Sequence, residues 1–369
     1  MINRLVIENL KHRWVRTLLA ALVIGVQVMS ILTLIGLSRG LLKESADRAK
    51  GSGADIFLFP SKQGMFSLSS GQINQGFIPF LLKQPHITDA VGILSAGLPG
   101  QIFTKLNGLD FPAFEKLNGH IPFLAGRPPT GPNDLVVDSA YARQNHLHVG
   151  DTVKLLNHNW RLSGIIAGGV LGRLIVPLTT LQQLTGNYNP PRLTEILVKL
   201  DNSNRTDAEV TALNELLKGD LQVVSTADFV ATFNLNNIPA LQAFIGVITT
   251  IAVVVGFLVV FLSMYTAVVE RTREIGILKA LGAKPAIILK ILVREAVLLA
   301  VAGFIFGIIL FFFAQACIAV FIPATLAVVN VPEWYPIAGG IAVLGALLGA
   351  IYPGLKAARQ DAIEALAYE

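Results

Sequence analysis

Four long runs of uncharged, mostly apolar residues dominate the pattern of the chain. They cover residues 17–37, 240–269, 296–331 and 334–355. Each run exceeds the roughly 20 residues that an α-helix needs to cross the hydrocarbon core of a bilayer. We assign a single span to the third run, because two membrane-crossing helices within its 36 residues would leave no room for a turn between them. With their flanks, the predicted transmembrane helices lie at 17–38, 240–269, 285–322 and 336–355.

Short apolar segments separated by turn signals fill the stretch between the first two spans. The segments with strand character read IFLFP, QIFTKLNGL, DLVVDS, DTVKLL, RLSGIIAGGVLGRLIVPL and LQVVS. Residues 203–219 predict a helix, and the polar residues 39–50 predict a helical stalk that continues the first span. We therefore expect one large mixed α/β domain at 39–239. The predicted fold class is an α-helical membrane protein with four transmembrane helices in a one-plus-three order, with this domain between helices one and two.

The first 16 residues place apolar and polar side chains on opposite sides at helical spacing. They predict an amphipathic helix at 1–16 that lies in the membrane interface, or simply the start of the first span. A cleaved signal peptide is a third interpretation of this end. The uncharged run is longer than a typical signal-peptide core and no A-x-A cleavage site follows it, so a retained anchor is favoured.

The composition agrees with a membrane protein. The 369 residues are 53% hydrophobic and 14% charged, with a mean hydropathy of +0.61, whereas a soluble domain is usually about a quarter charged. Four Lys or Arg precede the first span, six follow the second, two lie in the tail and none lies at 323–335. The positive-inside rule therefore places both termini and residues 270–284 in the cytoplasm, and residues 39–239 and 323–335 outside.

The net charge of +5 concentrates on the cytoplasmic side. Residues 39–239 hold 17 basic and 16 acidic side chains, which leaves a net charge of only +1 in that domain. The remaining positive charge faces anionic membrane lipid, so it does not indicate nucleic-acid binding.

Recognisable catalytic motifs are missing from the sequence. It has no Gly-Lys pair, so a Walker A phosphate loop cannot form, and it has no H-E-x-x-H or C-x-x-C. Its one G-x-S-x-G match, at residues 36–40, lies where the first span is predicted to continue into a helical stalk, and not at the strand-to-helix turn that a nucleophilic serine needs. The four uncharged runs contain no Asp, Glu, Lys, Arg or His side chain for catalysis inside the membrane. His146 and His148, near His158, would share a strand face and suit a metal, but a polar surface ahead of the VGD turn is favoured. We predict no catalytic residue, no metal site and no cofactor in this chain.

Two G-x-x-x-G pairs lie in the last two spans, Gly303 with Gly307 and Gly345 with Gly349. Small residues four positions apart let two helix backbones approach closely. The pairs predict packing between spans three and four of one chain, or between two chains, and packing within one chain is favoured.

A dense charged patch follows the second span, where five charged side chains fall between Glu270 and Lys279. If this stretch is helical, Ile277, Leu278 and Leu281 form an apolar stripe on it. A membrane anchor beside the span would account for the basic side chains but not for the two glutamates. A docking surface for a cytoplasmic protein accounts for both, and we favour it.

Local interactions are expected to stabilise this short helix. Ion pairs between side chains three positions apart can join Glu270 to Arg273 and Arg271 to Glu274. Gly282 is expected to cap the end of the helix, and the proline that follows in LGAKP is expected to stop it.

The stretch ERTREIGILKALGA closely resembles the signature of the FtsX/MacB-type ABC transporter permeases. The tail YPGLKAARQDAIEAL and the segments GRPPTGPNDLVVDSAYARQNHLHVGDTVKLL and GIIAGGVLGRLIVPLTTLQQL resemble the same family, as does the order of spans. The resemblance implies a MacB-like periplasmic core domain at 39–239, an FtsX-like permease domain at 240–369, and a coupling helix at 270–284 that meets the ATPase subunit. The residues implied in that contact are Glu270, Arg271, Arg273, Glu274, Ile275, Gly276, Lys279, Leu281 and Gly282.

The resemblance also implies a function and its partners. Such a permease subunit pairs with a second copy of itself in the bacterial inner membrane. We expect two copies of a separate cytoplasmic ABC ATPase, which bind the ATP and magnesium. Mechanotransmission through the helices would move the outer domain, for export or extraction of an amphipathic, lipid-like or peptide-like substrate. Membrane lipids are expected neighbours, and participation of a periplasmic adaptor protein and an outer-membrane channel stays open.

Other functions fit the same architecture. The main alternative is a signalling permease that activates an extracytoplasmic hydrolase without moving a substrate. A sensor partner for a kinase is less favoured, because related sensors have more spans. A membrane enzyme is least favoured, because the catalytic motifs are missing.

Overall fold

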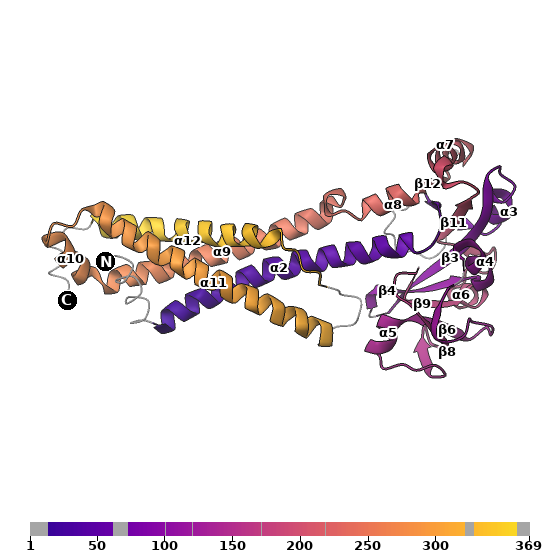
Figure 1. The fold of residues 1–369 in the computed structure, drawn as a ribbon, viewed down its shortest axis with the longest axis horizontal. Coiled ribbons are helices and arrows are strands. Elements are labelled where there is room, and N and C mark those ends of the chain that lie inside the picture. The colour runs from indigo at the N-terminus through magenta and orange to yellow at the C-terminus, as the bar shows by residue number, and fades with distance from the viewer. Residues whose placement is uncertain are drawn as a thin grey trace. The chain divides into compact units, whose positions relative to one another are not determined.

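The chain divides into two compact units, and Figure 1 labels most of their elements. The computed structural model describes residues 14–61, 73–99, 101–119, 121–170, 172–217, 219–321 and 328–359. The helical unit comprises the described residues up to Gly40 and from Pro239 onward. The sheet unit comprises the described residues from Leu41 to Ile238.

Three predicted segments fall partly outside the described residues. The amphipathic helix at 1–16 is described only from Trp14, the external loop at 323–335 only from residue 328, and the tail at 356–369 only to Arg359. Trp14 is the first residue of helix α2, and Arg359 is the last residue of helix α12.

Four helices are long and apolar enough to cross a membrane. They are α2 (Trp14–Lys50), α9 (Pro239–Glu270), α11 (Pro285–Phe321) and α12 (Trp334–Arg359). One of them precedes the sheet unit and three follow it, which confirms the predicted fold class. Helix α2 runs without a break through the apolar residues 17–37 and the polar residues 39–50, so the first span and the stalk are one element.

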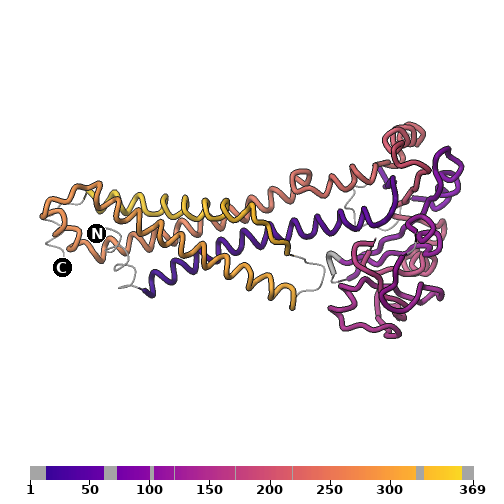
Figure 2. Tube along the Cα trace, viewed as in Figure 1, coloured from indigo at the N-terminus to yellow at the C-terminus, as the bar shows by residue number. Residues whose placement is uncertain are grey.

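Small side chains bring the long helices of the helical unit together. Helix α12 packs against both α9 and α11, and the trace in Figure 2 shows these helices running alongside one another. Buried alanine and glycine residues recur along α12 from Ala338 to Ala358. Such residues let helix backbones approach closely, so that van der Waals packing joins helices within a membrane.

A ten-stranded mixed sheet forms the frame of the sheet unit, in the order β12-β1-β11-β3-β4-β9-β6-β8-β5, with β7 paired to β8. The strands are β1 (Ile56–Pro60), β3 (Ile87–Leu98), β4 (Gln101–Leu109), β5 (Phe123–Gly126), β6 (Asp134–Asp138), β7 (Thr152–Leu155), β8 (His158–Ile166), β9 (Leu174–Pro177), β11 (Glu195–Leu200) and β12 (Leu221–Ser225). Among these described strands, β4 with β9 and β6 with β8 are the parallel pairs. A small second sheet pairs β2 (Ile73–Asn74) with β10 (Arg192–Leu193).

Short helices cover both faces of this sheet. They are α3 (Phe77–Leu81), α4 (Phe111–Asn118), α5 (Ser139–Gln144), α6 (Leu178–Thr185), α7 (Thr206–Leu217) and α8 (Thr226–Thr232). One core contains side chains of α3, α5, α6 and α7, and the other contains side chains of α4, α8 and the last turn of α2. In β11, Ile196 and Val198 point into the first core and Leu197 into the second, so this strand is buried on both faces.

The two strands β3 and β11, neighbours within the sheet, lie outside the strands predicted from the sequence. A Cβ added to Gly92 of β3 would lie 2.3 Å from Cδ1 of Leu193, so a larger residue there would displace the Leu193 side chain. Glycine inside a strand weakens the local strand signal, and pairing with β4 and β11 stabilises β3 instead. The predicted apolar segment at 161–178 is likewise divided between β8 and β9, with a glycine-rich loop between them.

Candidate functional site

The charged patch after α9 forms a separate short helix, α10 (Thr272–Ala280). Arg271 is the one residue between the two helices, and its φ of −111° and ψ of 16° depart from helical values. The hydroxyl of Thr272 donates to the carbonyl of Val269 at 2.8 Å. Helix α10 is thus a distinct element that begins against the last turn of α9.

The end of α10 is closed by a glycine cap. The amide of Ala283 donates to the carbonyl of Leu278 at 3.0 Å, and the amide of Gly282 donates to the carbonyl of Lys279 at 2.9 Å. Gly282 has a φ of +87°, a left-handed conformation that glycine adopts without strain. The predicted cap at Gly282 is confirmed.

One face of α10 is buried against the other helices of the helical unit. Thr272, Ile275 and Gly276 form this face. Ile275 belongs to a small apolar cluster with side chains from α9, α11 and α12, whose members are Val268, Ile275, Ile288, Leu292 and Ala357. Helix α10 is therefore held to three long helices at once.

The opposite face of α10 is exposed. Arg273, Glu274 and Ile277 lie on it, and Leu281 and Gly282 continue it beyond the helix. Leu281 is 80% exposed and Ile277 is 47% exposed. Apolar side chains that stay exposed next to charged ones are typical of a protein-interaction surface. Arg273, Glu274, Ile277 and Leu281 are termed the open face of α10.

A buried ion pair fixes the junction between α9 and α10. Nη1 of Arg271 lies 3.2 Å from Oε2 of Glu295 in α11, and the two residues are 8% and 1% exposed. Removing one partner of such a pair leaves a buried charge uncompensated and typically costs about 3–5 kcal/mol. The sequence predicted Glu274 as the partner of Arg271. The structure gives Glu295 instead, because Arg271 is buried against α11 while Glu274 lies on the open face.

A second ion pair joins the end of α9 to the start of α2. Nη1 of Arg16 donates to Oε2 of Glu270 at 2.9 Å, and the two side chains are 22% and 47% exposed. An exposed pair of this kind contributes at most about 1 kcal/mol. The predicted partner of Glu270 was Arg273, which lies on the open face. Arg16 and Glu295 were missed because they lie 254 and 24 positions from their partners, where local spacing carries no signal.

The glycine pairs pack helices within one chain, but not the helices that were predicted. A Cβ added to Gly303 of α11 would lie 2.6 Å from Cβ of Ile24 in α2, and one added to Gly307 would lie 2.7 Å from a valine of α2. A Cβ added to Gly349 of α12 would lie 3.0 Å from the backbone nitrogen of Phe261 in α9. The structure thus joins α11 to α2 and α12 to α9 at these glycines, instead of α11 to α12.

The other predicted residues lie away from the open face of α10. Gly276 is buried and Lys279 is half-buried. Gly345 of α12 is buried too, yet a Cβ added there would meet no atom within 4 Å. His146 and His148 join no metal site: within the described residues, no group of three or more His, Cys, Asp or Glu side chains is placed to hold an ion.

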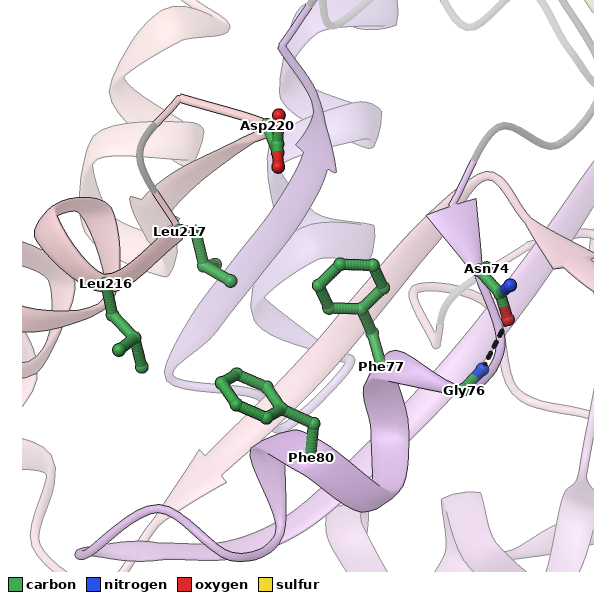
Figure 3. A pocket seen from close by; sticks show the side chains of 7 residues that line it. All are labelled: Asn74, Gly76, Phe77, Phe80, Leu216, Leu217 and Asp220. Carbon is green, nitrogen blue, oxygen red and sulfur yellow. Dashed lines mark hydrogen bonds between the residues drawn. The ribbon is translucent and has the colours of Figure 1, made fainter.

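A groove of about 480 Å³ lies in the sheet unit between α3 and α7. Phe77 and Phe80 face Leu216 and Leu217 across it, and Asp220 stands at its rim (Figure 3). The groove contains none of the residues predicted from the sequence, so the open face of α10 remains the candidate site.

Two family models match the chain. The MacB-like periplasmic core domain matches residues 17–216, and the FtsX-like permease C-terminal model matches residues 246–362. The first match covers more than half of the 369 residues, and the second contains α10 and its supporting helices α11 and α12.

The chain is also similar to curated proteins. The macrolide export ATP-binding/permease protein MacB of Aggregatibacter actinomycetemcomitans is 28% identical over 327 residues, 80% of this chain and 50% of that protein. The ABC transporter permease YknZ of Bacillus subtilis is 28% identical over 227 residues, 60% of this chain and 55% of that protein. The pyoverdine export ATP-binding/permease protein PvdT of Pseudomonas putida is 29% identical over 240 residues, 60% of this chain and 35% of that protein.

The comparison extends to solved structures. The crystal structure of the periplasmic region of MacB from Actinobacillus actinomycetemcomitans aligns with a TM-score of 0.38 and 20% identity, over 49% of this chain and 94% of that one. The chain spans about half the length of the MacB relatives that it matches. From the two family models, the chain belongs to the MacB/FtsX-type family of ABC transporter permeases.

Proposed function

We propose that this permease couples ATP hydrolysis in a partner ABC ATPase to movement of the sheet unit on the other side of the membrane. The main support for the proposal is that α10 has one exposed face and one face buried against the long helices. Its open face offers two apolar side chains, Ile277 and Leu281, to a partner. Its buried face is tied to α9, α11 and α12 through the cluster around Ile275 and the pair Arg271–Glu295. A force applied to the open face would therefore act on three long helices together.

The chemistry of the open face suits a protein partner. Ile277 and Leu281 would fill an apolar depression, and Arg273 and Glu274 would pair with charges of opposite sign on the ATPase. The ATP and magnesium would be bound by that ATPase, and this chain would supply no catalytic group. Two ATPases would serve two copies of the permease.

The proposed orientation puts α10 in the cytoplasm of a bacterial cell and the sheet unit outside its inner membrane. Six Lys or Arg residues lie in the stretch from Arg271 to Arg294, and an excess of basic residues marks cytoplasmic loops. The match of residues 17–216 to a periplasmic core domain supports the same orientation.

The proposed substrate is amphipathic, lipid-like or peptide-like, and is handled on the outer side of the membrane. The middle parts of the four long helices carry no charged side chain, so they offer no polar conduit, and movement of the sheet unit would do the work. Two relatives are named for export of macrolide and of pyoverdine. An adaptor protein and an outer-membrane channel would extend such a route.

The coupling proposal is tested by recovering the tagged chain from its native membrane in a gentle detergent and identifying bound proteins by mass spectrometry. We expect an ABC ATPase with the wild-type chain and at least about a tenfold loss of it with Leu281→Glu, because a charge would enter an apolar contact. Leu124→Glu is the matched control, since Leu124 is 62% exposed in the sheet unit.

The outcomes separate the candidate functions. Equal recovery of the ATPase with Leu281→Glu and with Leu124→Glu would remove the open face from the coupling site. An extracytoplasmic hydrolase bound together with the ATPase, without lipid or peptide cargo, would favour the signalling permease over the transporter.

A further inference from the structure

The last turns of α2 end in a charged contact with the sheet unit, to which they belong. Nη2 of Arg48 donates to Oδ2 of Asp138 at 2.7 Å and to Oε1 of Glu44 at 2.8 Å. Arg173 also donates to Glu44. Two of these residues belong to α2, Asp138 ends β6, and Arg173 precedes β9. Together the four residues are termed the clamp.

The clamp is largely buried and its charges are paired, although among the described residues Nη1 of Arg173 has no hydrogen-bond partner. Asp138 is 0% exposed and Arg173 is 8% exposed. The second carboxylate oxygen of Asp138 accepts a hydrogen bond of 2.7 Å from the amide of Tyr141 at the start of α5. The amide of Asp138 donates to the carbonyl of Arg173 at 2.9 Å. Displacing α2 from this position would leave buried charges unpaired, which is strongly unfavourable in a low-dielectric interior.

The backbone that leaves α2 fits just as closely. A Cβ added to Gly51 would lie 1.9 Å from the carbonyl oxygen of Gly169, in the loop between β8 and β9. Gly53 has a φ of +71°, and a Cβ there would lie 2.3 Å from Oδ1 of Asn118 in α4. Ala49 packs in the sheet-unit core that also contains side chains of α4 and α8. The end of α2 is therefore held by side-chain charges, by backbone contact and by apolar packing.

The sheet unit is joined to the long helices at two places, the end of α2 and residues 234–238 before α9. The hydrogen bonds at residues 234–238 differ from those of the clamp. Asn234 accepts a side-chain hydrogen bond of 3.1 Å from the amide of Asn236, and the side chain of Asn237 donates to the carbonyl of Ala231 at 2.8 Å. Both bonds join close neighbours in sequence, and the three asparagines are exposed. These two bonds are local to the turn, whereas the clamp bonds between α2 and the rest of the sheet unit join residues at least 90 positions apart in the sequence.

We propose that the clamp makes α2 the driving connection of the permease, the one that transmits movement of the helices to the sheet unit. Residues 234–238 are then the yielding connection, the one whose backbone changes conformation. The inference rests on the proposed function, in which movement of the helices reaches the sheet unit. When α2 moves relative to α9, the sheet unit follows α2 as one body, and the change of geometry is taken up at residues 234–238. Arg48, Asp138 and Arg173 are positioning residues in this device.

Hydrogen exchange on the full chain in lipid nanodiscs tests the clamp without any partner. We expect amides at 43–50 to exchange at least about tenfold more slowly than those at 234–238. Arg48→Ala should raise exchange at 43–50 by at least about tenfold, because it leaves Asp138 buried without its cation. Arg48→Lys, which keeps the charge, should give an intermediate rate, and Lys50→Ala, an exposed change on the same helix, should match the wild type.

Two results would overturn the clamp. One is equal exchange at 43–50 and 234–238 in the wild type. The other is an Arg48→Ala pattern that matches Lys50→Ala. If Arg48→Ala does not fold, Arg48→Lys still decides the test. Exchange at 43–50 that is equal in Arg48→Lys and the wild type would show that the clamp does not need the paired hydrogen bonds of a guanidinium group.

A second experiment tests transmission with the native ATPase in proteoliposomes. Spin labels at Lys154→Cys, in a Cys317→Ser background that removes the one native cysteine, report the distance between the sheet units of two copies. We expect a nucleotide-dependent change in the wild type that Arg48→Ala abolishes while keeping ATP hydrolysis within about twofold. An unchanged response in Arg48→Ala would refute α2 as the driving connection. No response in the wild type would refute the proposed function, while the exchange result would still decide the clamp.

Discussion

Arg271 and Glu295 differ from the other charged residues around α10 in their burial. An arginine stays charged in any protein environment, so the buried guanidinium of Arg271 depends on the carboxylate that lies 3.2 Å away. Glu274, on the open face, has no such structural role. At the scale of the residue, stability and docking therefore rest on different side chains of the same short stretch.

Replacing Glu295 with Gln should lower the free energy of unfolding by about 3 kcal/mol, because it leaves a buried charge without its counterion. Unfolding of the full chain in mixed detergent micelles measures the change. Glu274→Gln is the control and should change stability by less than about 0.5 kcal/mol. Equal stability of the two variants would mean that the Arg271–Glu295 pair is not buried as described.

The glycines of α11 and α12 give a second prediction at this scale. Gly307→Ala should destabilise the chain by about 1–3 kcal/mol, because its Cβ would lie 2.7 Å from a valine of α2. Gly345→Ala should be neutral or slightly stabilising, because a Cβ there meets no atom within 4 Å and alanine favours a helix. The same unfolding measurement applies, and the reverse order of the two effects would contradict the helix pairing.

Glu195 of β11 gives a prediction of pH dependence. Burial raises the pKa of its carboxyl to about 7 from an ordinary 4.5, and Lys105 opposes part of the shift. The folded state therefore favours the protonated form, so the wild type loses stability as pH rises from 4.5 to about 7. Because Glu195 keeps some exposure, we expect Glu195→Gln to be about 1–2 kcal/mol more stable at pH 8 and equal to the wild type below pH 4. Unfolding curves at the two pH values measure this, and a pH-independent difference would contradict it.

At the scale of the element, α10 shows what local sequence can and cannot predict. The helix and its cap at Gly282 follow from neighbouring residues, and both were predictable. Which face is open depends on Ile288, Leu292 and Ala357, which come from other helices. The sequence favoured a docking surface on this stretch because of its two glutamates. An apolar stripe by itself usually faces a core, so the exposure of Ile277 and Leu281 is known from the structure.

The sheet shows the same limit. Strand β1 is a continuous apolar run and β6 has an apolar centre between two aspartates, and their sequences predicted them. Strand β3 contains Gly92 and Gly97 and forms because β4 and β11 pair with it on either side. The clamp, too, joins Glu44 and Arg48 to Asp138 and Arg173 across long separations, where spacing alone carries no signal.

Reversing a charge on the open face tests α10 as a docking element. Glu274→Lys should reduce the ATP hydrolysis that the permease stimulates in its partner by at least about tenfold, because like charges across an interface cost several kcal/mol. Hydrolysis by the reconstituted complex is the readout. Glu215→Lys, an exposed reversal on α7 of the sheet unit, is the control, and expression should be unchanged in both. Full stimulation by Glu274→Lys would exclude that residue from the docking contact.

At the scale of the whole molecule, the sequence was most informative about the order of its parts. Long uncharged runs report transmembrane helices directly, so the four spans and the domain between the first two could be predicted. The paths by which force would pass from α10 to the long helices, and from α2 to the sheet unit, could not be predicted, because each depends on buried charges brought together by the fold. The open face and the clamp are thus the two places where the structure adds to the sequence.

The most direct test of the account is a photo-crosslinking amino acid placed at Leu281 and, as a control, at Leu124, in cells of the native organism. The account predicts that the adduct at Leu281 is an ABC ATPase and that no ATPase is captured at Leu124. Adducts at Leu281 that contain only lipid, or no ATPase at all, would contradict coupling through α10 and leave that helix as a membrane anchor.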